Sequence, residues 1–244
     1  MKAGERTLIV IPTFNEADNL KRLTAEIARA LPDADQLVVD DASADGTGNL
    51  ADQLARDEPR LKVLHRPRKL GLGSAYVSGF RWGLERGYQR FFEMDADFSH
   101  DPSYLPAFCA ELDAGADVVV GSRNVPGGAV RGWGPLRHAI SRGGSLYSRM
   151  MLGVPVRDLT TGFKAYTRRA LEAIELEQVR SNGYAFQVET TFRAQRAGLR
   201  VVEVPILFVD RRAGKSKMTL RDIFEAVVRV PVMRVNSSRR RGQR

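Results

Sequence analysis

The sequence predicts an α/β protein with a mostly parallel central sheet flanked by helices. Short apolar runs rich in Val, Ile and Leu alternate with longer segments in which apolar residues recur at helical spacing. This alternation is typical of parallel strands, because each connection between them has to cross the sheet and usually does so as a helix. With 244 residues, 43% of them hydrophobic, the chain can fill the core of one large domain.

Strands and helices alternate regularly in the first 123 residues. The strands are expected at 7–13, 36–43, 61–66, 90–97 and 117–123, and the helices at 15–31, 47–56, 74–86 and 104–113. In the first helix, Leu20, Leu23, Ile27 and Leu31 recur at helical spacing, and Asn15 is the predicted cap. The alternation indicates one half built from βαβ units that ends near residue 123.

The second half of the chain is less regular. Residues 124–135 are rich in Gly and Pro and predict a loop, and residues 158–166 predict a series of turns. Helices are expected at 136–152, 186–198 and 219–230, the last of them ending near Pro231, and a strand at 201–211. We therefore predict a single domain over 1–235, with halves at 7–123 and 124–235, followed by a basic, disordered tail at 236–244.

The bulk composition points to an anionic partner. A net charge of +9 and a pI near 10 favour nucleic acid, a lipid surface or phosphorylated ligands, although a bias of the genome toward Arg codons would give the same charge. No nucleic-acid-binding module is recognisable and the aromatic residues are not interleaved with the Arg clusters, so no nucleic-acid partner is expected.

The compartment is predicted from three features. The single cysteine, Cys109, cannot form an intramolecular disulfide, which favours a reducing compartment. The apolar stretch near the N-terminus is too short for a signal peptide, and no apolar run approaches the roughly 18 to 20 residues that cross a bilayer. A soluble protein, or one bound to a membrane surface, is expected.

Polar residues stand at the ends of four predicted strands. They are Asn15 and Glu16, Asp40 and Asp41, Asp95 and Asp97, and Ser122 and Arg123. In parallel α/β sheets ligands bind beyond the carboxyl ends of the strands, so these side chains are expected to line one crevice. On a continuing strand Asp95 and Asp97 would point to the same side and suit Mg²⁺ or Mn²⁺. The simpler alternative is an acidic turn before a helix, and Asp101 is the predicted cap after which Pro102 begins that helix.

Several motifs occur in the order found in one enzyme family. They are IPTFNEADNL, VVDDASADGT, GLGSAYVSGF, MDADFSHDP, GSR, ISRG, DLTTGFKAY and FVDRRAGKSK, spread over residues 7 to about 220. In these motifs the chain resembles the dolichol-phosphate mannose synthases of the soluble, catalytic-domain type. That group lies within the inverting family 2 glycosyltransferases, so the resemblance implies the GT-A fold.

The resemblance also implies the site. The donor residues would be Pro12, Phe14, Glu16, Val39, Asp40, Asp41, Asp95, Ala96, Asp97, Arg123, Arg211 and Lys217, all in a nucleotide-binding half at 7–123 except the late basic pair. Asp95, Asp97 and Ser99 would face the metal, and Asp97 would be its main ligand. Asp97, Arg123, Arg211 and Lys217 would be catalytic. Ser141 and Arg142, in an acceptor-binding half at 124–235, would receive the acceptor's phosphate.

The implied reaction is the inverting transfer of mannose from GDP-mannose to a polyprenyl or dolichyl monophosphate, with Mg²⁺ or Mn²⁺, at the cytoplasmic face of the membrane. Some relatives carry transmembrane helices or use a membrane partner, so a membrane-anchoring protein partner is allowed. One alternative is a UDP-glucose-dependent polyprenyl-phosphate glucosyltransferase. Another is transfer to a cell-envelope sugar, whose hydroxyl would need a catalytic base that the sequence does not place.

Two predicted helices are amphipathic and basic. Residues 136–152 carry three Arg beside Leu136, Ile140, Leu146, Met150 and Met151, and residues 219–230 combine five apolar residues with Arg221 and Arg229. Either helix could lie on an anionic bilayer. The alternative, which is as well supported for the second helix, is that both pack on the sheet.

Overall fold

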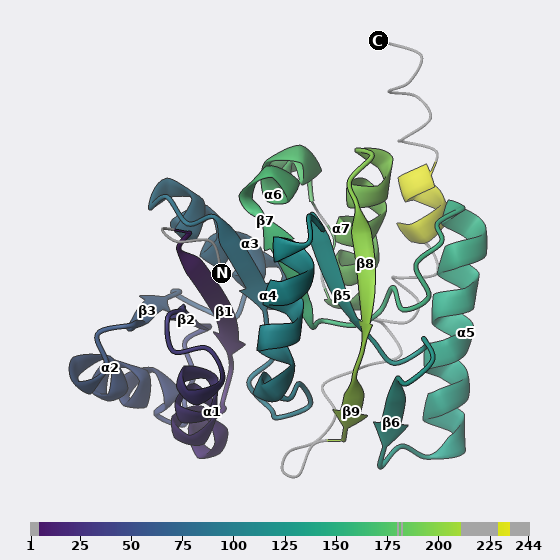
Figure 1. Ribbon diagram of the computed structural model, residues 1–244. Coiled ribbons are helices and arrows are strands. Elements are labelled where there is room, and N and C mark those ends of the chain that lie inside the picture. The colour runs from purple at the N-terminus through teal and green to yellow at the C-terminus, as the bar shows by residue number, and fades with distance from the viewer. Residues whose placement is uncertain (1–4, 180, 182, 211–228, 235–244) are drawn as a thin grey trace.

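The computed structural model describes residues 5–179, 181, 183–210 and 229–234 (Figure 1). The strands are β1 (Thr7–Thr13), β2 (Asp35–Asp40), β3 (Leu61–His65), β4 (Arg90–Glu93), β5 (Val118–Ser122), β6 (Ala129–Arg131), β7 (Lys164–Thr167), β8 (Val201–Pro205) and β9 (Leu207–Val209). The α-helices are α1 (Ala17–Ala30), α2 (Thr47–Asp57), α3 (Leu72–Glu85), α4 (Leu105–Asp113), α5 (Pro135–Leu152), α6 (Arg168–Ile174) and α7 (Gly183–Arg196). Short 3₁₀ helices lie at Pro102–Tyr104 and Leu176–Gln178.

A seven-stranded sheet runs through the molecule in the order β3-β2-β1-β4-β7-β5-β8. Only β7 runs antiparallel to its neighbours in this sheet, and it lies between β4 and β5. A second, two-stranded parallel sheet pairs β6 with β9. The mostly parallel α/β prediction is therefore confirmed, and both predicted halves of the chain contribute to one sheet.

The two faces of the sheet are covered by different helices, as the alternation of residues along β1 shows. Leu8 and Val10 pack with residues of α3 and α7, whereas Ile9 and Ile11 pack with residues of α1 and α4. The helix α3 approaches β1 closely, because a Cβ built on Gly79 would lie 2.4 Å from Val10 Cγ1. Gly79 in the GLGSAYVSGF motif thus serves helix–strand packing, and Gly71, with φ of +99°, precedes the first turn of α3.

Pro12 stands in the central strand β1 at a place where its missing N–H costs nothing. Val10 accepts a hydrogen bond from Met94 N, so the backbone groups of Val10 face β4. Pro12, two residues later, faces the same side, beyond Glu93, the last residue of β4 that pairs with β1. The pairing of β1 with β4 therefore ends before Pro12, and no ladder hydrogen bond is lost there.

The structure corrects several sequence-based boundaries in the second half. The predicted loop at 124–135 contains β6, and the predicted turns at 158–166 lead into β7. The predicted strand at 201–211 is two strands, because β8 pairs with β5 whereas β9 pairs with β6. Residues 229–234 are helical, so the helix does not end near Pro231, and most of the predicted helix at 219–230 lies outside the described residues, as does the predicted tail.

The prediction that Asn15 caps the first helix is also wrong. The N-cap of α1 is Glu16, and the Asn15 side chain instead accepts a hydrogen bond from Ala44 N at 3.0 Å. Asn15 has φ of +57°, a left-handed conformation that Asn tolerates better than most residues. The Asp101 prediction is confirmed, since its carboxylate accepts from Ser103 N at the start of the 3₁₀ helix at Pro102. Across the described ranges, we find no helix that is both long and apolar enough to span a bilayer.

Candidate active site

The carboxyl ends of β1, β2, β4 and β5 all meet at one edge of the sheet, since these strands are parallel to β1 or lie in the same direction across β7. The predicted donor residues sit at or just beyond these ends. Pro12 pairs in register with Val39, and Thr13 pairs with Asp40. The sheet thus brings the first predicted pocket residues together, as the strand-end pattern indicates.

Asp40 and Asp41, at the end of β2, are both engaged by neighbouring residues of the chain. Asp40 accepts from the hydroxyls of Thr13 (2.9 Å) and Ser43 (2.6 Å). Asp41 forms a buried ion pair with Arg66 and accepts from Leu70 N at 3.1 Å. These carboxylates therefore shape the loops after β2 and β3.

The residues after β1 form a second group at this edge. Phe14 lies beneath the ammonium of Lys69, which is 4.1 Å from the centre of the ring. Glu16 accepts from Asn19 Nδ2, and its own backbone N–H donates to the Thr47 hydroxyl. Phe14 and Lys69, from two separate loops, thus form one aromatic and basic surface at the edge of the sheet.

Asp95, Ala96, Asp97 and Ser99 lie in a turn after β4. The prediction of a continuing strand is wrong here: β4 ends at Glu93, and Phe98 has φ of +60°. The turn is held at both acids. Asp95 accepts from the Tyr76 hydroxyl at 2.9 Å, and Asp97 Oδ1 accepts from Ser99 N at 3.0 Å.

His100 and Tyr76 hold this acidic turn in place through contacts with Asp95. His100 is buried, and its Nδ1 accepts from Asp95 N at 3.1 Å while lying 3.9 Å from Asp95 Oδ2. Burial and the Asp95 charge raise the pKa of Tyr76 well above its ordinary value, so its hydroxyl stays protonated and donates to Asp95. Both contacts hold the backbone of the turn and the Asp95 carboxylate in place.

The turn fits a divalent cation whose remaining ligands come from a substrate. Within the described ranges no group of three or more His, Cys, Asp or Glu side chains is arranged to hold a metal by itself. Two carboxylates within three residues, Asp95 being partly exposed, match the way Mg²⁺ is bound through one or two carboxylates together with phosphates and water. Asp95 and Asp97 could hold such an ion, and Ser99 belongs to the same turn through its backbone N–H, which donates to Asp97.

Arg123 follows β5 and is held by Asp158. Its Nε and Nη2 donate to the two carboxylate oxygens of Asp158 at 2.7 Å each, and Nη2 also donates to Thr160 Oγ1 at 2.8 Å. Burial raises the pKa of Asp158, but the charge and hydrogen bonds of Arg123 outweigh it and hold that pKa below the ordinary value. Arg123 is therefore a fixed guanidinium whose charge is balanced.

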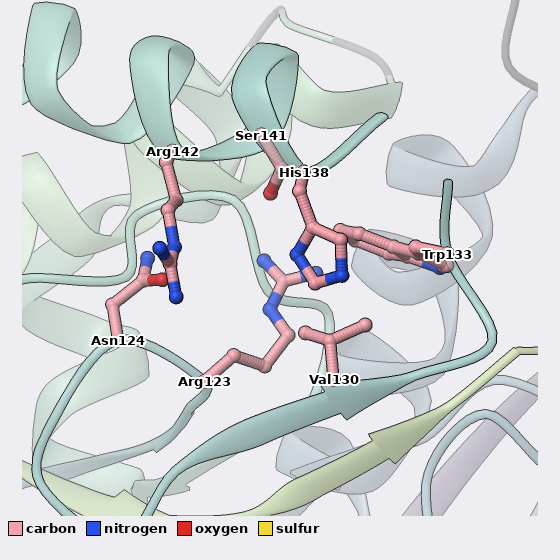
Figure 2. A pocket seen from close by; sticks show the side chains of 7 residues that line it. All are labelled: Arg123, Asn124, Val130, Trp133, His138, Ser141 and Arg142. Carbon is pink, nitrogen blue, oxygen red and sulfur yellow. The ribbon is translucent and has the colours of Figure 1, made fainter. Parts of the chain in front are cut away.

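A small pocket joins Arg123 to the helix α5 (Figure 2). It is lined by Arg123, Asn124, Val130, Trp133, His138, Ser141 and Arg142. Arg142 points from α5 toward Asn124, and Arg123 lies between Arg142 and His138. The structure thus brings the predicted acceptor residues Ser141 and Arg142 beside Arg123, and none of the described residues that line this pocket is a carboxylate.

The loop from Asp158 to Gly162 connects this pocket to the acidic turn. Asp158 and Thr160 bind Arg123, and a Cβ built on Gly162 would lie 3.5 Å from Asp95 Oδ2. Gly162 therefore brings the loop close to the Asp95 carboxylate. The DLTTG motif is the physical link between the two parts of the candidate site.

A buried pair of charged residues, Glu93 and Lys164, follows this loop in the sheet. Glu93 of β4 and Lys164 of β7 are opposite each other in the antiparallel register, and both are fully buried. Burial raises the pKa of Glu93 to about 7 although the Lys164 charge opposes the rise. Burial lowers the pKa of Lys164 to about 8 against the charge of Glu93, and Lys164 Nζ donates to Gln187 O at 2.7 Å.

Several residues of this site were missed by sequence reasoning. The motif DLTTG carried a signal, but nothing in it named Asp158 as the partner of Arg123, 35 positions away. Trp133 lies in the segment that was predicted to be a loop. His138 lies in a predicted helix, and the sequence did not indicate which side of that helix faces the pocket. Arg211 and Lys217, the predicted late basic pair, lie outside the described residues. Asp210, just before them, is paired with Arg137 of α5 at 2.8 Å.

Comparisons with known proteins relate the chain to glycosyltransferases. A model of the family described as glycosyl transferase family 2 matches residues 8–175. An undecaprenyl-phosphate mannosyltransferase from Micrococcus luteus is 52% identical over 92% of this chain and 92% of that protein. A polyprenol monophosphomannose synthase from Mycolicibacterium smegmatis is 50% identical over 94% of this chain and 87% of that protein.

Solved structures share the fold at low identity. A glucosyl-3-phosphoglycerate synthase from Mycobacterium tuberculosis, in complex with Mn²⁺, UDP-glucose and phosphoglyceric acid, aligns with a TM-score of 0.68 and 19% identity over 97% of this chain and 80% of that chain. A crystal structure of another mycobacterial protein aligns with a TM-score of 0.69 and 19% identity over 97% of this chain and 75% of that chain. The fold is therefore of the GT-A type, as expected. Since the family model covers more than half of the chain and relatives at 50% identity or above span most of it, the chain belongs to glycosyl transferase family 2 and is a glycosyltransferase.

Proposed function

We propose that this glycosyltransferase moves mannose from GDP-mannose to a polyprenyl monophosphate, with inversion at the anomeric carbon. The observation that carries the proposal is the pocket in which Arg142 and Ser141 of α5 meet Arg123, with no carboxylate among the described residues of its lining. Such a set of donors suits a phosphate oxyanion. The names of the two curated relatives support a mannosyl group and a polyprenyl phosphate as the substrates.

The donor side of the proposal uses the sheet edge. Asp95 and Asp97 would hold Mg²⁺ or Mn²⁺, and the ion would supply positive charge to the diphosphate that leaves. Phe14 and Lys69 provide an aromatic and basic surface for a nucleotide. Arg211 and Lys217 are proposed to close over the phosphates, in line with the motif resemblance. The Tyr76 and His100 contacts keep the Asp95 turn in one geometry during the reaction.

The acceptor side needs no strong general base. The second pKa of a phosphate monoester is roughly 6, so the attacking oxygen is already ionised near neutral pH. That oxygen forms the new bond to the anomeric carbon as the bond to GDP breaks, and attack from the opposite side inverts the centre. Arg142 has to offset the repulsion between the acceptor phosphate and the donor diphosphate, because the charge of Arg123 is already balanced by Asp158.

The lipid acceptor also sets the proposed location. A polyprenyl phosphate resides in a bilayer, so we place the protein peripherally at the cytoplasmic face of the membrane. A membrane-anchoring protein partner belongs to the same proposal. Neither statement is needed for the chemistry at the pocket.

An assay with purified protein tests the reaction. The protein is incubated with a short-chain polyprenyl phosphate and either GDP-mannose or UDP-glucose, in Mg²⁺, Mn²⁺ or chelator. We expect mannosylated lipid from GDP-mannose and its loss in chelator. Transfer from UDP-glucose alone would contradict the donor and favour the glucosyltransferase alternative, and equal transfer in chelator would contradict the metal.

A matched pair of variants tests the acidic turn in the same assay. Asp97→Asn removes a carboxylate charge but keeps an oxygen that can accept from Ser99 N, so the turn should persist. We expect the turnover to fall by at least about a hundredfold. Asp101→Asn is the control, because among the described residues the Asp101 carboxylate accepts from Ser103 N alone, at 2.8 Å, and Asn caps equally well. Equal activity of the two variants would contradict the role of Asp97.

A further inference from the structure

Phe208 of β9 lies beside the pocket that Arg123 shares with α5, here called the acceptor pocket. The Phe208 side chain is buried, and in the two-stranded sheet it stands opposite Val130, which lines the pocket. The centre of its ring is 5.2 Å from that of Trp133 and 5.4 Å from Arg123 Cζ. Phe208 thus adjoins three residues of the pocket lining.

The same ring also reaches the acidic turn, through His100. The two ring centres are 5.9 Å apart and the ring planes meet at 75°, an edge-to-face arrangement. His100 in turn accepts a hydrogen bond from Asp95 N. A second contact holds β9 in this place, because the Leu207 N–H donates to the Tyr104 hydroxyl, just after the acidic turn, at 2.9 Å. The strand β9 is therefore fastened to the segment that forms the turn.

Trp133 continues these contacts into the acceptor pocket. Its ring centre lies 4.4 Å from the guanidinium carbon of Arg137 and 5.5 Å from that of Arg123. In Figure 2, Trp133 and Arg142 lie on opposite sides of the Arg123 guanidinium. Three rings in contact thus connect the acidic turn to the pocket, and we call them the aromatic link: His100, Phe208 and Trp133.

The reaction makes the relative position of the two parts important. In the proposed transfer, the acceptor oxygen in the pocket has to meet the anomeric carbon of a donor held at the acidic turn. A misplacement of about 1 Å between reacting groups can slow a reaction about a hundredfold. Because protein interiors are close-packed, a smaller side chain at position 208 would leave space into which either part could shift.

We propose that Phe208 is a positioning residue, which fixes the acceptor pocket relative to the acidic turn and so aligns the two substrates. Its role in turnover rests on the proposed function, whereas the connection between the two parts does not. Phe208 acts through His100 and Arg123 and not by binding either substrate. The rate of the bound complex should therefore depend on Phe208 more than the affinity for donor or acceptor does.

Three variants test this role in the transfer of mannose to a short, water-soluble polyprenyl phosphate. Phe208→Leu removes the ring, and Phe208→Tyr keeps it. The control is Phe192→Leu, because Phe192 of α7 is also buried but packs in a separate apolar cluster with Leu152 and Val188. We expect Phe208→Leu to lower kcat by at least about tenfold, with both KM values within about threefold of the wild type. Phe208→Tyr and the control should keep kcat within about threefold of the wild type, although the control also loses stability to urea.

A second test needs no substrate and uses the fluorescence of Trp133. The chain has two tryptophans, so Trp82→Phe leaves Trp133 as the single reporter. In this background His100→Gln removes the ring beside the turn, and Phe208→Leu removes the middle ring of the aromatic link. We expect each change to shift the Trp133 emission to longer wavelength. The double variant should shift it no further than Phe208→Leu alone, since His100 reaches Trp133 through Phe208.

The inference is overturned if Phe208→Leu lowers kcat no more than Phe192→Leu does, or if the emission shifts of His100→Gln and Phe208→Leu simply add. If Phe208→Leu does not fold, Phe208→Met replaces it in both tests, because Met fills a similar volume without a ring. A wild type that transfers no mannose from GDP-mannose would contradict the proposed function instead. The emission shifts alone would then decide whether Phe208 connects the two parts.

Discussion

Two arginines enter one pocket from regions of opposite character. Arg123 follows the buried strand β5, its side chain is 4% exposed, and its guanidinium grips the fully buried carboxylate of Asp158. Arg142 projects from α5 and is exposed to solvent, and in the part of the chain that the structure describes it has no carboxylate partner. The same residue type thus occurs once as part of the buried framework and once as a charge that has no carboxylate partner among the described residues.

The difference separates two contributions that a phosphate site needs. The paired Arg123 offers N–H groups in fixed positions but little net charge, because the Asp158 charge cancels it. Arg142 offers net charge on a flexible side chain, at the cost of ordering it when a ligand arrives. Damage to the first region should therefore appear as lost stability, and damage to the second as lost affinity for the acceptor.

Disrupting the buried ion pair between Arg123 and Asp158 should cause the largest loss of stability. Asp158→Asn keeps the size of the side chain but removes the negative charge from the buried ion pair that Asp158 forms with Arg123. We expect the free energy of unfolding, measured by urea denaturation, to fall by about 3 to 5 kcal/mol. The control is Glu26→Gln, which removes one charge from the exposed pair with Arg22 and should cost less than about 1 kcal/mol. A loss no larger than in the control would show that Arg123 does not depend on Asp158.

The Glu93–Lys164 pair sharpens the comparison, because it is buried but less well satisfied. Glu93 accepts from the Tyr166 hydroxyl at 2.9 Å, whereas its other carboxylate oxygen has no hydrogen-bond partner among the described residues. Its pKa of about 7 lies above the ordinary 4.5, so the folded state holds this proton more tightly than the unfolded state does. The stability that Glu93 contributes is therefore complete below pH 4.5 and is lost as the pH rises through 7.

Urea denaturation of the wild type and of Glu93→Gln, at several pH values, measures this loss. Gln cannot ionise, so the other carboxylates titrate equally in both proteins and cancel in the difference. Between pH 5 and 7.5 the wild type should lose about 2 to 3 kcal/mol relative to the variant. Parallel curves over this range would show that Glu93 is ionised throughout and that Lys164 fully compensates it.

Much of the fold was predictable because its information is local. The strand predicted at 7–13 matches β1, whose seven residues are all buried and uninterrupted by charge. By contrast, β7 is only four residues long and carries the buried Lys164, so its strand character comes from pairing with β4 and β5. The same holds for β6, which pairs with β9 across some 75 residues of sequence. Contacts of that kind leave no periodicity in the sequence.

The motifs grouped candidate residues that the structure also places close together, but they did not indicate the partners of those residues. The structure brings Arg123, Ser141 and Arg142 to one pocket and puts Asp95 and Asp97 in one turn, in agreement with the motifs. The network around them was not predictable, because each hydrogen bond joins segments that only the folded chain brings together. Tyr76 reaches Asp95 from α3, for example, and Asp158 reaches Arg123 from a loop in the other half.

On the exposed side of the comparison, Arg142→Gln should weaken acceptor use while sparing the donor. Loss of a charged hydrogen bond to phosphate costs about 1.5 to 3 kcal/mol, so we expect kcat/KM for a short, water-soluble polyprenyl phosphate to fall by about 10- to 100-fold. The KM for GDP-mannose should change less than about threefold, because Arg142 lies beside Ser141 and not in the Asp95 turn. The unfolding free energy should stay within about 0.5 kcal/mol of the wild type, as is usual for an exposed side chain.

Two further variants show whether the loss of kcat/KM in Arg142→Gln comes from the position of Arg142 or only from its charge. Arg142→Lys keeps the charge but not the planar fork, and should recover part of the lost kcat/KM. Arg149→Gln removes the same charge from the same helix, two turns away and outside the pocket lining. With a water-soluble acceptor there is no membrane for Arg149 to meet, so this variant should behave as the wild type. If Arg149→Gln lowered kcat/KM as much as Arg142→Gln does, α5 would act on the acceptor through its total positive charge. Arg142 would then differ from Arg123 only in being exposed, and not in its position in the pocket.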